Sequence, residues 1–123
     1  MISGRMRSAR EAVAEVSVRG PGGSSMAVDA IIDTGFTQYL TLPAQLIGQL
    51  GLTRQGTVTI VLADGSNKRV PVFNAKVGLG GTFRSVDIEE SEGDIILGMG
   101  LLYNCRLSIE AIEDGHVFIE VID

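Results

Sequence analysis

Hydrophobic and polar residues alternate along most of the chain in short runs, and the runs are separated by glycine-rich or polar stretches. Alternation with a period of two is typical of β-strands, because successive side chains of a strand point to opposite faces of the sheet. The pattern predicts strands over residues 11–19, 26–32, 39–42, 57–63, 68–77, 83–88, 106–109 and 116–122. Turn signals such as Gly-Pro-Gly-Gly at 20–23 and Asp64-Gly65 join neighbouring strands into hairpins.

Two short segments break the alternation. Between Pro43 and Gly51 the apolar residues follow helical spacing, and proline at the start with glycine at the end is typical of a helix, here expected over residues 44–50. Residues 98–103 are expected to form one or two helical turns. The chain is therefore predicted to be all-β with one or two short helices.

Length and composition predict one globular domain. The chain has 123 residues, of which 45% are hydrophobic, so it can bury a core of its own. Residues 11–123 are expected to form that domain, and the arginine-rich residues 1–10 are expected to be a flexible N-terminal segment.

Charge and cysteine content narrow the possible partners and the compartment. The formal net charge of −5 argues against nucleic acid as a partner, since phosphate binding needs clustered Lys and Arg. No apolar run approaches the roughly 20 residues that span a bilayer, so no membrane association is expected. A single cysteine, Cys105, fits a reducing cytoplasm.

No cofactor or metal is expected from the sequence. His116 is the only histidine, and the acidic run Glu89–Asp94 lacks the ligand spacing of a calcium loop. We expect this run to be a solvated loop, and Cys105 to be a buried structural thiol and not a nucleophile.

The residue pattern with the clearest chemistry is Ala30-Ile31-Ile32-Asp33-Thr34-Gly35. A carboxylate at the mouth of an apolar strand is costly unless it is hydrogen-bonded or paired. The following hydroxyl and glycine offer a partner and a sharp turn. A second apolar run that ends in glycine, Ile95-Ile96-Leu97-Gly98, follows about sixty residues later.

These two elements, in this order, resemble the retropepsin-like aspartic proteases of clan AA. The resemblance covers positions 28–102. It implies a small, closed or partly open acid-protease-type β-barrel that is homodimeric. It also implies that Asp33 is catalytic, that Thr34 and Gly35 shape the active-site loop, and that Ile96, Leu97 and Gly98 pack beneath that loop. The hairpin tip at Ala63, Asp64, Gly65 and Ser66 takes the place of the substrate-binding flap.

The chemistry of this family needs two carboxylates that share one proton, because like charges about 3 Å apart cannot both ionise. The chain carries a single Asp-Thr-Gly. The second carboxylate is therefore expected from Asp33 of another copy, in a two-fold homodimer that cleaves a peptide or protein substrate. Asp29, four residues earlier, is a candidate for a second local carboxylate, but we expect it to be solvated or paired with an arginine.

Two departures from the family pattern leave other functions open. Phe36 replaces a small residue, and the tip over residues 63–68 is polar and less rich in glycine than a retroviral flap. One alternative is a catalytically inactive retropepsin-like module that dimerises or binds peptides. Another is a monomeric β-barrel interaction protein whose Asp-Thr-Gly is only a turn.

Overall fold

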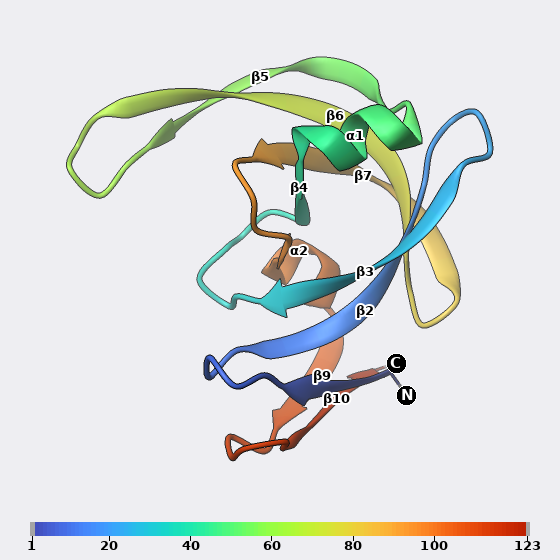
Figure 1. The fold of residues 1–123 in the computed structure, drawn as a ribbon, viewed down its shortest axis with the longest axis vertical. Helices are drawn as coiled ribbons and strands as arrows, with labels where there is room; N and C mark the ends of the chain where they lie inside the picture. The colour runs from blue at the N-terminus through green and yellow to red at the C-terminus, as the bar shows by residue number, and fades with distance from the viewer. Residues whose placement is uncertain (1, 123) are drawn as a thin grey trace.

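The computed structural model describes residues 2–122 and is built from β-strands with two short helices (Figure 1). In chain order the elements are β1 (Ile2–Met6), β2 (Ala12–Arg19), β3 (Ser25–Ile32), β4 (Leu40–Pro43), α1 (Ala44–Leu50), β5 (Thr53–Val61), β6 (Asn67–Leu79), β7 (Thr82–Ser91), β8 (Ile96–Leu97), α2 (Met99–Leu102), β9 (Cys105–Ile109) and β10 (His116–Val121). The prediction of an all-β chain with short helices is confirmed.

The strands form one sheet in the order β5-β6-β7-β4-β8-β3-β2-β1-β10-β9. β6 also pairs with β2, through residues 76–78 and 17–19, so the sheet curls back on itself at one corner. Most neighbours are antiparallel, whereas β3 with β8 and β4 with β7 are parallel pairs. In Figure 1 the long β5–β6 hairpin arches over the body of the molecule, and its tip extends on the same side as the loop after β3.

The core lies inside this curled sheet and is closed by the two helices. The largest side chains that are almost fully buried are Leu40, Leu42, Ile88, Leu97, Ile119, Val13, Val16, Val18, Val77 and Val117. Most of them alternate along their strands, as the period of two requires, whereas the first three residues of β2, Ala12, Val13 and Ala14, are all buried. No polar or charged side chain is buried among residues 2–122.

Helix α1 has the bounds that its sequence predicts. Pro43 is extended at its N-terminus, and Gly51 is left-handed at its C-terminus with φ 62°. Gly51 donates its N–H to the Gly48 carbonyl, and Leu52 donates to the Ile47 carbonyl. This glycine termination satisfies carbonyls that the end of the helix leaves unpaired.

The N-terminus differs from the expected flexible segment over residues 1–10. Ile2–Met6 form β1, which pairs with β10 on one side and β2 on the other. The first residues form a strand because they pair with the edge of β10, more than a hundred residues away in the chain. The local sequence does not indicate this pairing. β1 thus belongs to the same sheet as the domain predicted over residues 11–123.

The acidic run also differs in part from the loop expected over Glu89–Asp94. β7 continues through Ser91, because β4 pairs with it in parallel at residues 40–43. The loop is therefore confined to residues 92–95. None of the helices described in residues 2–122 is long and apolar enough to cross a membrane.

Candidate active site

Asp33 lies directly after β3, where two parallel strands end together. β3 pairs with β8 through Ile31 with Ile96 and Ile32 with Leu97. The Asp33 N–H then donates to the Leu97 carbonyl at 3.0 Å, which continues the ladder by one residue. The Asp33 side chain is exposed to solvent. The sheet therefore fixes the backbone of a carboxylate that solvent can reach.

The turn after Asp33 is held by the carboxylate itself. The Gly35 N–H donates to Asp33 Oδ1 at 2.8 Å, and the Phe36 N–H donates to the Asp33 carbonyl at 3.1 Å. A Cβ on Gly35 would lie 3.2 Å from the same Oδ1, which is a crowded contact. Glycine therefore lets the backbone approach the carboxylate closely. Thr34 is exposed beside it.

Residues 96–98 lie against the loop that follows Asp33. Gly98 donates its N–H to the Tyr39 carbonyl at 3.0 Å, and Met99 donates to the Phe36 carbonyl at 2.7 Å. A Cβ on Gly98 would collide with the Gln38 carbonyl and lie 2.5 Å from the Phe36 ring. The structure thus brings Ile96, Leu97 and Gly98 together with Asp33, Thr34 and Gly35.

Thr41 ties this corner together and is a residue that sequence reasoning missed. Its hydroxyl accepts the Ile96 N–H at 2.9 Å and donates to the Asp94 carbonyl at 2.9 Å. The Ser91 hydroxyl donates to the same carbonyl at 2.7 Å. The partners are more than fifty residues from Thr41 in the chain, so nothing local indicated the contact.

The tip of the β5–β6 hairpin, at Ala63, Asp64, Gly65 and Ser66, is a short exposed turn. Gly65 donates its N–H to the Leu62 carbonyl at 2.9 Å and has φ 86°. Asp64 Oδ1 accepts hydrogen bonds from the Ser66 hydroxyl and from the Ser66 N–H. These bonds, the hydroxyl bond first, hold the pKa of the Asp64 carboxyl below its ordinary value.

A cleft of about 340 Å³ separates the loop after Asp33 from the β5–β6 hairpin. The loop contributes Gly35, Phe36, Thr37 and Gln38, and the rest of the lining comes from the hairpin and β7. The residues from the hairpin and β7 are Val58, Thr59, Ile60, Val72, Asp87 and Glu89. The cleft opens beside the Asp33 turn, because Gly35 of that turn lines it. The tip residues 63–66 do not line it.

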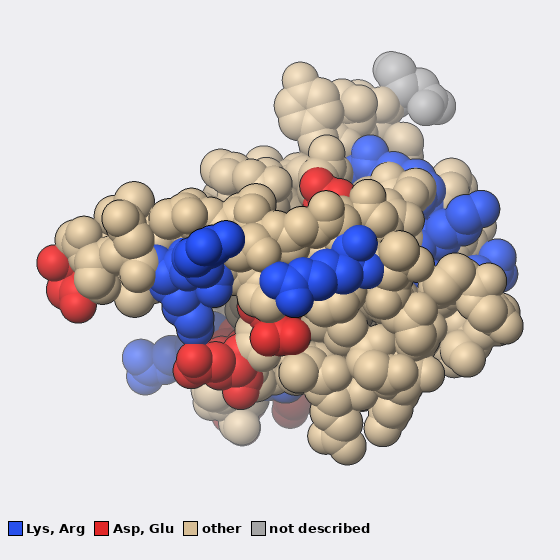
Figure 2. All heavy atoms as spheres, turned by 90° about the horizontal axis from the view of Figure 1, so that it is seen from above, with Lys and Arg blue, Asp and Glu red and all other residues tan. Residues whose placement is uncertain are grey.

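Charge around the cleft is mixed. Figure 2, which looks down on the hairpin, shows Lys and Arg side chains next to Asp and Glu on the left of this face, and further Lys and Arg side chains on the right. Lys68 Nζ lies 2.8 Å from Glu92 Oε1 and lowers the pKa of Glu92. Inside the cleft, desolvation and then the nearby Asp87 charge raise the pKa of Glu89.

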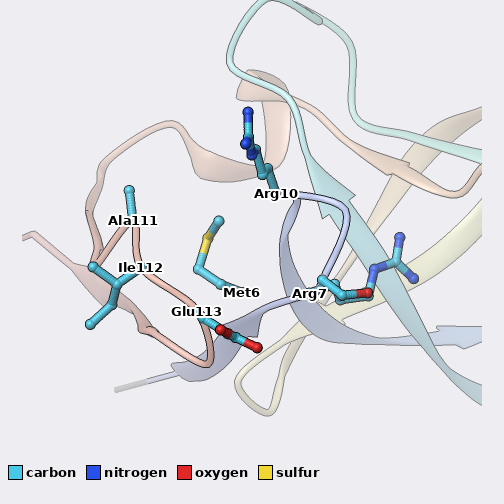
Figure 3. Close-up of a pocket in the computed structure, with 7 residues that line it drawn as sticks. Met6, Arg7, Arg10, Ala111, Ile112 and Glu113 are labelled. Carbon is cyan, nitrogen blue, oxygen red and sulfur yellow. The ribbon is translucent and has the colours of Figure 1, made fainter.

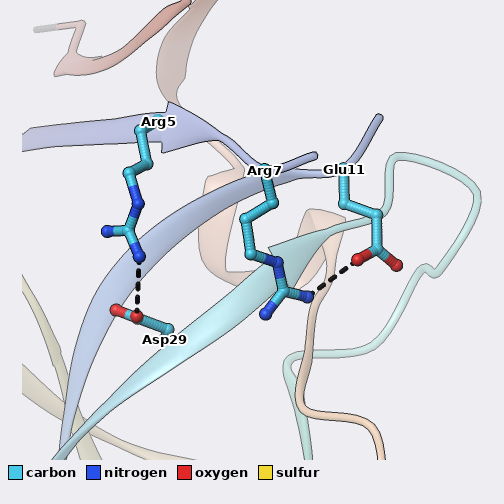
Figure 4. Close-up of polar contacts among 4 residues, drawn as sticks. All are labelled: Arg5, Arg7, Glu11 and Asp29. Atoms are coloured by element: carbon cyan, nitrogen blue, oxygen red, sulfur yellow. Dashed lines mark hydrogen bonds and ion pairs between the residues drawn. The ribbon is translucent and has the colours of Figure 1, made fainter. Parts of the chain in front are cut away.

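Asp29 is paired with an arginine, as one of the two sequence interpretations expected. Arg5 Nη2 on β1 lies 3.6 Å from Asp29 Oδ2 on β3 (Figure 4). In the same region, Arg7 bonds Glu11 at 2.8 Å. Asp29 therefore has Arg5 as its partner. It lies four residues before Asp33 on an extended strand and makes no contact that would pair the two carboxylates.

A larger concavity of about 510 Å³ lies beside the turn between β1 and β2 (Figure 3). The turn after β1 and the loop between β9 and β10 line it, with Met6, Arg7, Arg10, Ile112 and Glu113 among its residues. It shares no lining residue with the cleft beside Asp33. Over residues 2–122, no three His, Cys, Asp or Glu side chains gather in a way that could hold a metal ion.

Comparison with known proteins agrees with the sequence resemblance. A family model described as aspartyl protease matches residues 12–101, which include the Asp33 loop, the hairpin and the Ile96–Gly98 element. No curated protein matches the chain. The family match covers well over half of the 123 residues. The chain therefore belongs to the aspartyl protease family.

Proposed function

We propose that this protein is an aspartic endopeptidase that is active as a homodimer. Each subunit contributes Asp33 to a two-carboxylate site on the two-fold axis. The observation that carries the proposal is the placement of Asp33: it is exposed on a turn fixed by Leu97, beside a cleft that the hairpin covers. A single chain holds one such carboxylate, so a second copy completes the site.

The chemistry follows from two carboxylates that share a proton. The ionised carboxylate takes a proton from a water molecule, and the protonated one polarises the carbonyl of the scissile bond. The water oxygen then adds to that carbonyl carbon, and the amine leaves with a proton. The pair titrates as a unit, which favours activity on the acidic side of neutrality.

The surrounding residues have supporting roles in this proposal. Thr34 braces the two active-site loops across the dimer, and Gly35 lets the backbone approach the carboxylates. Ile96, Leu97 and Gly98 support the loop from beneath, and the tip residues Ala63–Ser66 close over an extended peptide bound by main-chain hydrogen bonds. The subunits are acid-protease-type barrels acting in the cytoplasm without a cofactor.

Phe36 does not contradict this function. Its ring packs against Gly98, where the absence of a side chain leaves room for it, and it also lines the cleft. The bulky residue is thus accommodated as a wall of the cleft beside Asp33. The alternative of an inactive peptide-binding module differs from the proposal in its response to mutation of Asp33.

Two measurements test the proposal. Sedimentation equilibrium at about pH 5 is expected to show a dimer over a concentration series. Asp33→Asn is expected to reduce cleavage of an unfolded protein substrate by roughly 10³-fold or more, because the ionised base is lost. The fold of the variant is expected to persist. Cleavage retained by Asp33→Asn, or a chain that stays monomeric at high concentration, would contradict the proposal. Peptide binding without cleavage by the wild-type chain would support the inactive module.

A further inference from the structure

Two carboxylates face the cleft from a single strand. Asp87 and Glu89 are two residues apart on β7, so their side chains point to the same face of the sheet. Val86, before Asp87, and Ile88, between the two carboxylates, are buried in the core. Both line the 340 Å³ cleft together with Phe36 from the loop after Asp33. Their position follows from the sheet and not from a flexible loop.

The other walls of this cleft combine apolar side chains with the polar side chains of Thr37, Gln38 and Thr59. Val58 and Ile60 come from β5, and Val72 comes from β6, where it sits directly opposite Glu89 in the strand register. The cleft therefore combines apolar sides with two carboxylates on one wall. That combination matches a long aliphatic side chain with a cation at its end, as in Lys and Arg.

Within residues 2–122, neither carboxylate forms an ion pair or a side-chain hydrogen bond. The lysine of the neighbouring hairpin strand, Lys68, is bonded to Glu92 outside the cleft. Partial desolvation and the Asp87 charge raise the pKa of Glu89. The wall thus carries negative charge whose repulsion a bound cation would relieve.

We propose that Asp87 and Glu89 make this cleft a specificity subsite for a Lys or Arg side chain of the substrate. The inference rests on the proposed protease function, because it assigns a substrate class to the same cleft. Gly35 and Thr37 also line the cleft, so the recognised residue lies within a few positions of the scissile bond. The two carboxylates are specificity residues and take no part in proton transfer.

The first test uses cleavage. A series of peptides carries one lysine moved through the positions around the scissile bond, and a matched series carries norleucine, which keeps the aliphatic stem without the charge. At one position the wild-type chain is expected to prefer lysine in kcat/KM. The variant Asp87→Asn with Glu89→Gln is expected to lower the ratio of the two kcat/KM values, lysine peptide over norleucine peptide, about tenfold.

The second test uses binding and does not depend on catalysis. The same lysine and norleucine peptides are titrated into Asp33→Asn, with and without the two cleft substitutions, and Kd is measured by calorimetry. Glu89→Lys in the same background is expected to reverse the preference toward a glutamate peptide. Asp87 and Glu89 are on a solvent-accessible wall of the cleft, so their substitution is expected to leave the fold intact. Thermal unfolding checks that each variant is folded.

The outcomes separate the two proposals. Cleavage with no lysine preference, or a preference unchanged in Asp87→Asn with Glu89→Gln, would overturn the subsite and leave the protease function intact. Selective lysine binding without any cleavage by the wild-type chain would overturn the protease function and keep the subsite. Equal Kd values for lysine and norleucine peptides would also overturn the subsite.

Discussion

The two sides of the cleft are built in different ways. The Asp33 side is held by backbone hydrogen bonds that join β3, β8 and the loop between β3 and β4, with Leu97 and Gly98 buried beneath. The β5–β6 hairpin is exposed along almost all of β5, which pairs only with β6. Val61, at the end of β5, has 73% of its surface exposed.

In the proposed protease, the two sides of the cleft have different tasks. A general base must be held within tenths of an ångström of its working position, and a ladder between buried strands supplies that constraint. A cover over an extended substrate must open and close, and a two-stranded ribbon with few buried contacts opens at low cost. Each of the next predictions tests one side against the other.

The largest expected difference is in amide hydrogen exchange. Ile31 and Gly98 donate to backbone carbonyls on the Asp33 side, and Leu62 and Gly65 do so at the hairpin tip. All four amides are hydrogen-bonded, so exchange reports local opening. We expect protection about a thousandfold greater, or about 4 kcal/mol, on the Asp33 side, measured by NMR. Equal protection of the four amides would contradict the difference in rigidity between the two sides of the cleft.

Gly98→Ala is expected to damage the Asp33 side most. The new Cβ would collide with the Gln38 carbonyl, which is backbone and cannot move without displacing the loop. We expect a loss of about 3 kcal/mol in the free energy of unfolding, measured by chemical denaturation.

Gly48→Ala is the matched control. Gly48 lies in α1, and a Cβ there would meet nothing within 4 Å. Alanine at this position is expected to stabilise the chain by about 1 kcal/mol, because glycine is a poor helix former. If Gly98→Ala proved as harmless as Gly48→Ala, the close approach beneath the loop would not constrain the fold.

Thr41→Val keeps the shape of the side chain and removes the hydroxyl that joins Ile96 to Asp94. We expect a loss of about 2 kcal/mol, because the Ile96 N–H is left without its partner. Thr59→Val on β5 is the matched change on an exposed residue of the hairpin, and it is expected to lie within about 0.5 kcal/mol of wild type. Similar losses for both variants would contradict the assigned role of Thr41.

The smallest effect is expected at the hairpin tip. The hydrogen bonds from Ser66 lower the pKa of Asp64, so they stabilise the ionised form. Their contribution is present above the unfolded pKa of about 3.9 and is lost as pH falls through the lower folded value. Asp64→Asn is therefore expected to make the local opening of the tip independent of pH in this acidic window. An unchanged pH dependence of Leu62 exchange would contradict this.

The sequence alone determined most local elements and the family. Periodicity of two indicated eight strands but neither β1 nor β8, Pro43 and Gly51 delimited α1, and Asp33-Thr34-Gly35 with Ile96-Leu97-Gly98 indicated the family. These features depend on neighbours along the chain, such as side-chain alternation, capping and turn chemistry, and such signals can be read without a fold. The single Asp-Thr-Gly is the sequence feature on which the proposal of a homodimer rests.

Only the tertiary structure decided which distant residues meet. Ile2–Met6 form a strand because they pair with the edge of β10. Thr41 joins two segments because its hydroxyl accepts the N–H of Ile96, the first residue of β8. Asp87 and Glu89 belong to a strand whose opposite face fills the core, so only the arching hairpin turns their face into a cleft wall. Contacts across fifty or more residues depend on how sheets curl and close, and local sequence does not encode that geometry.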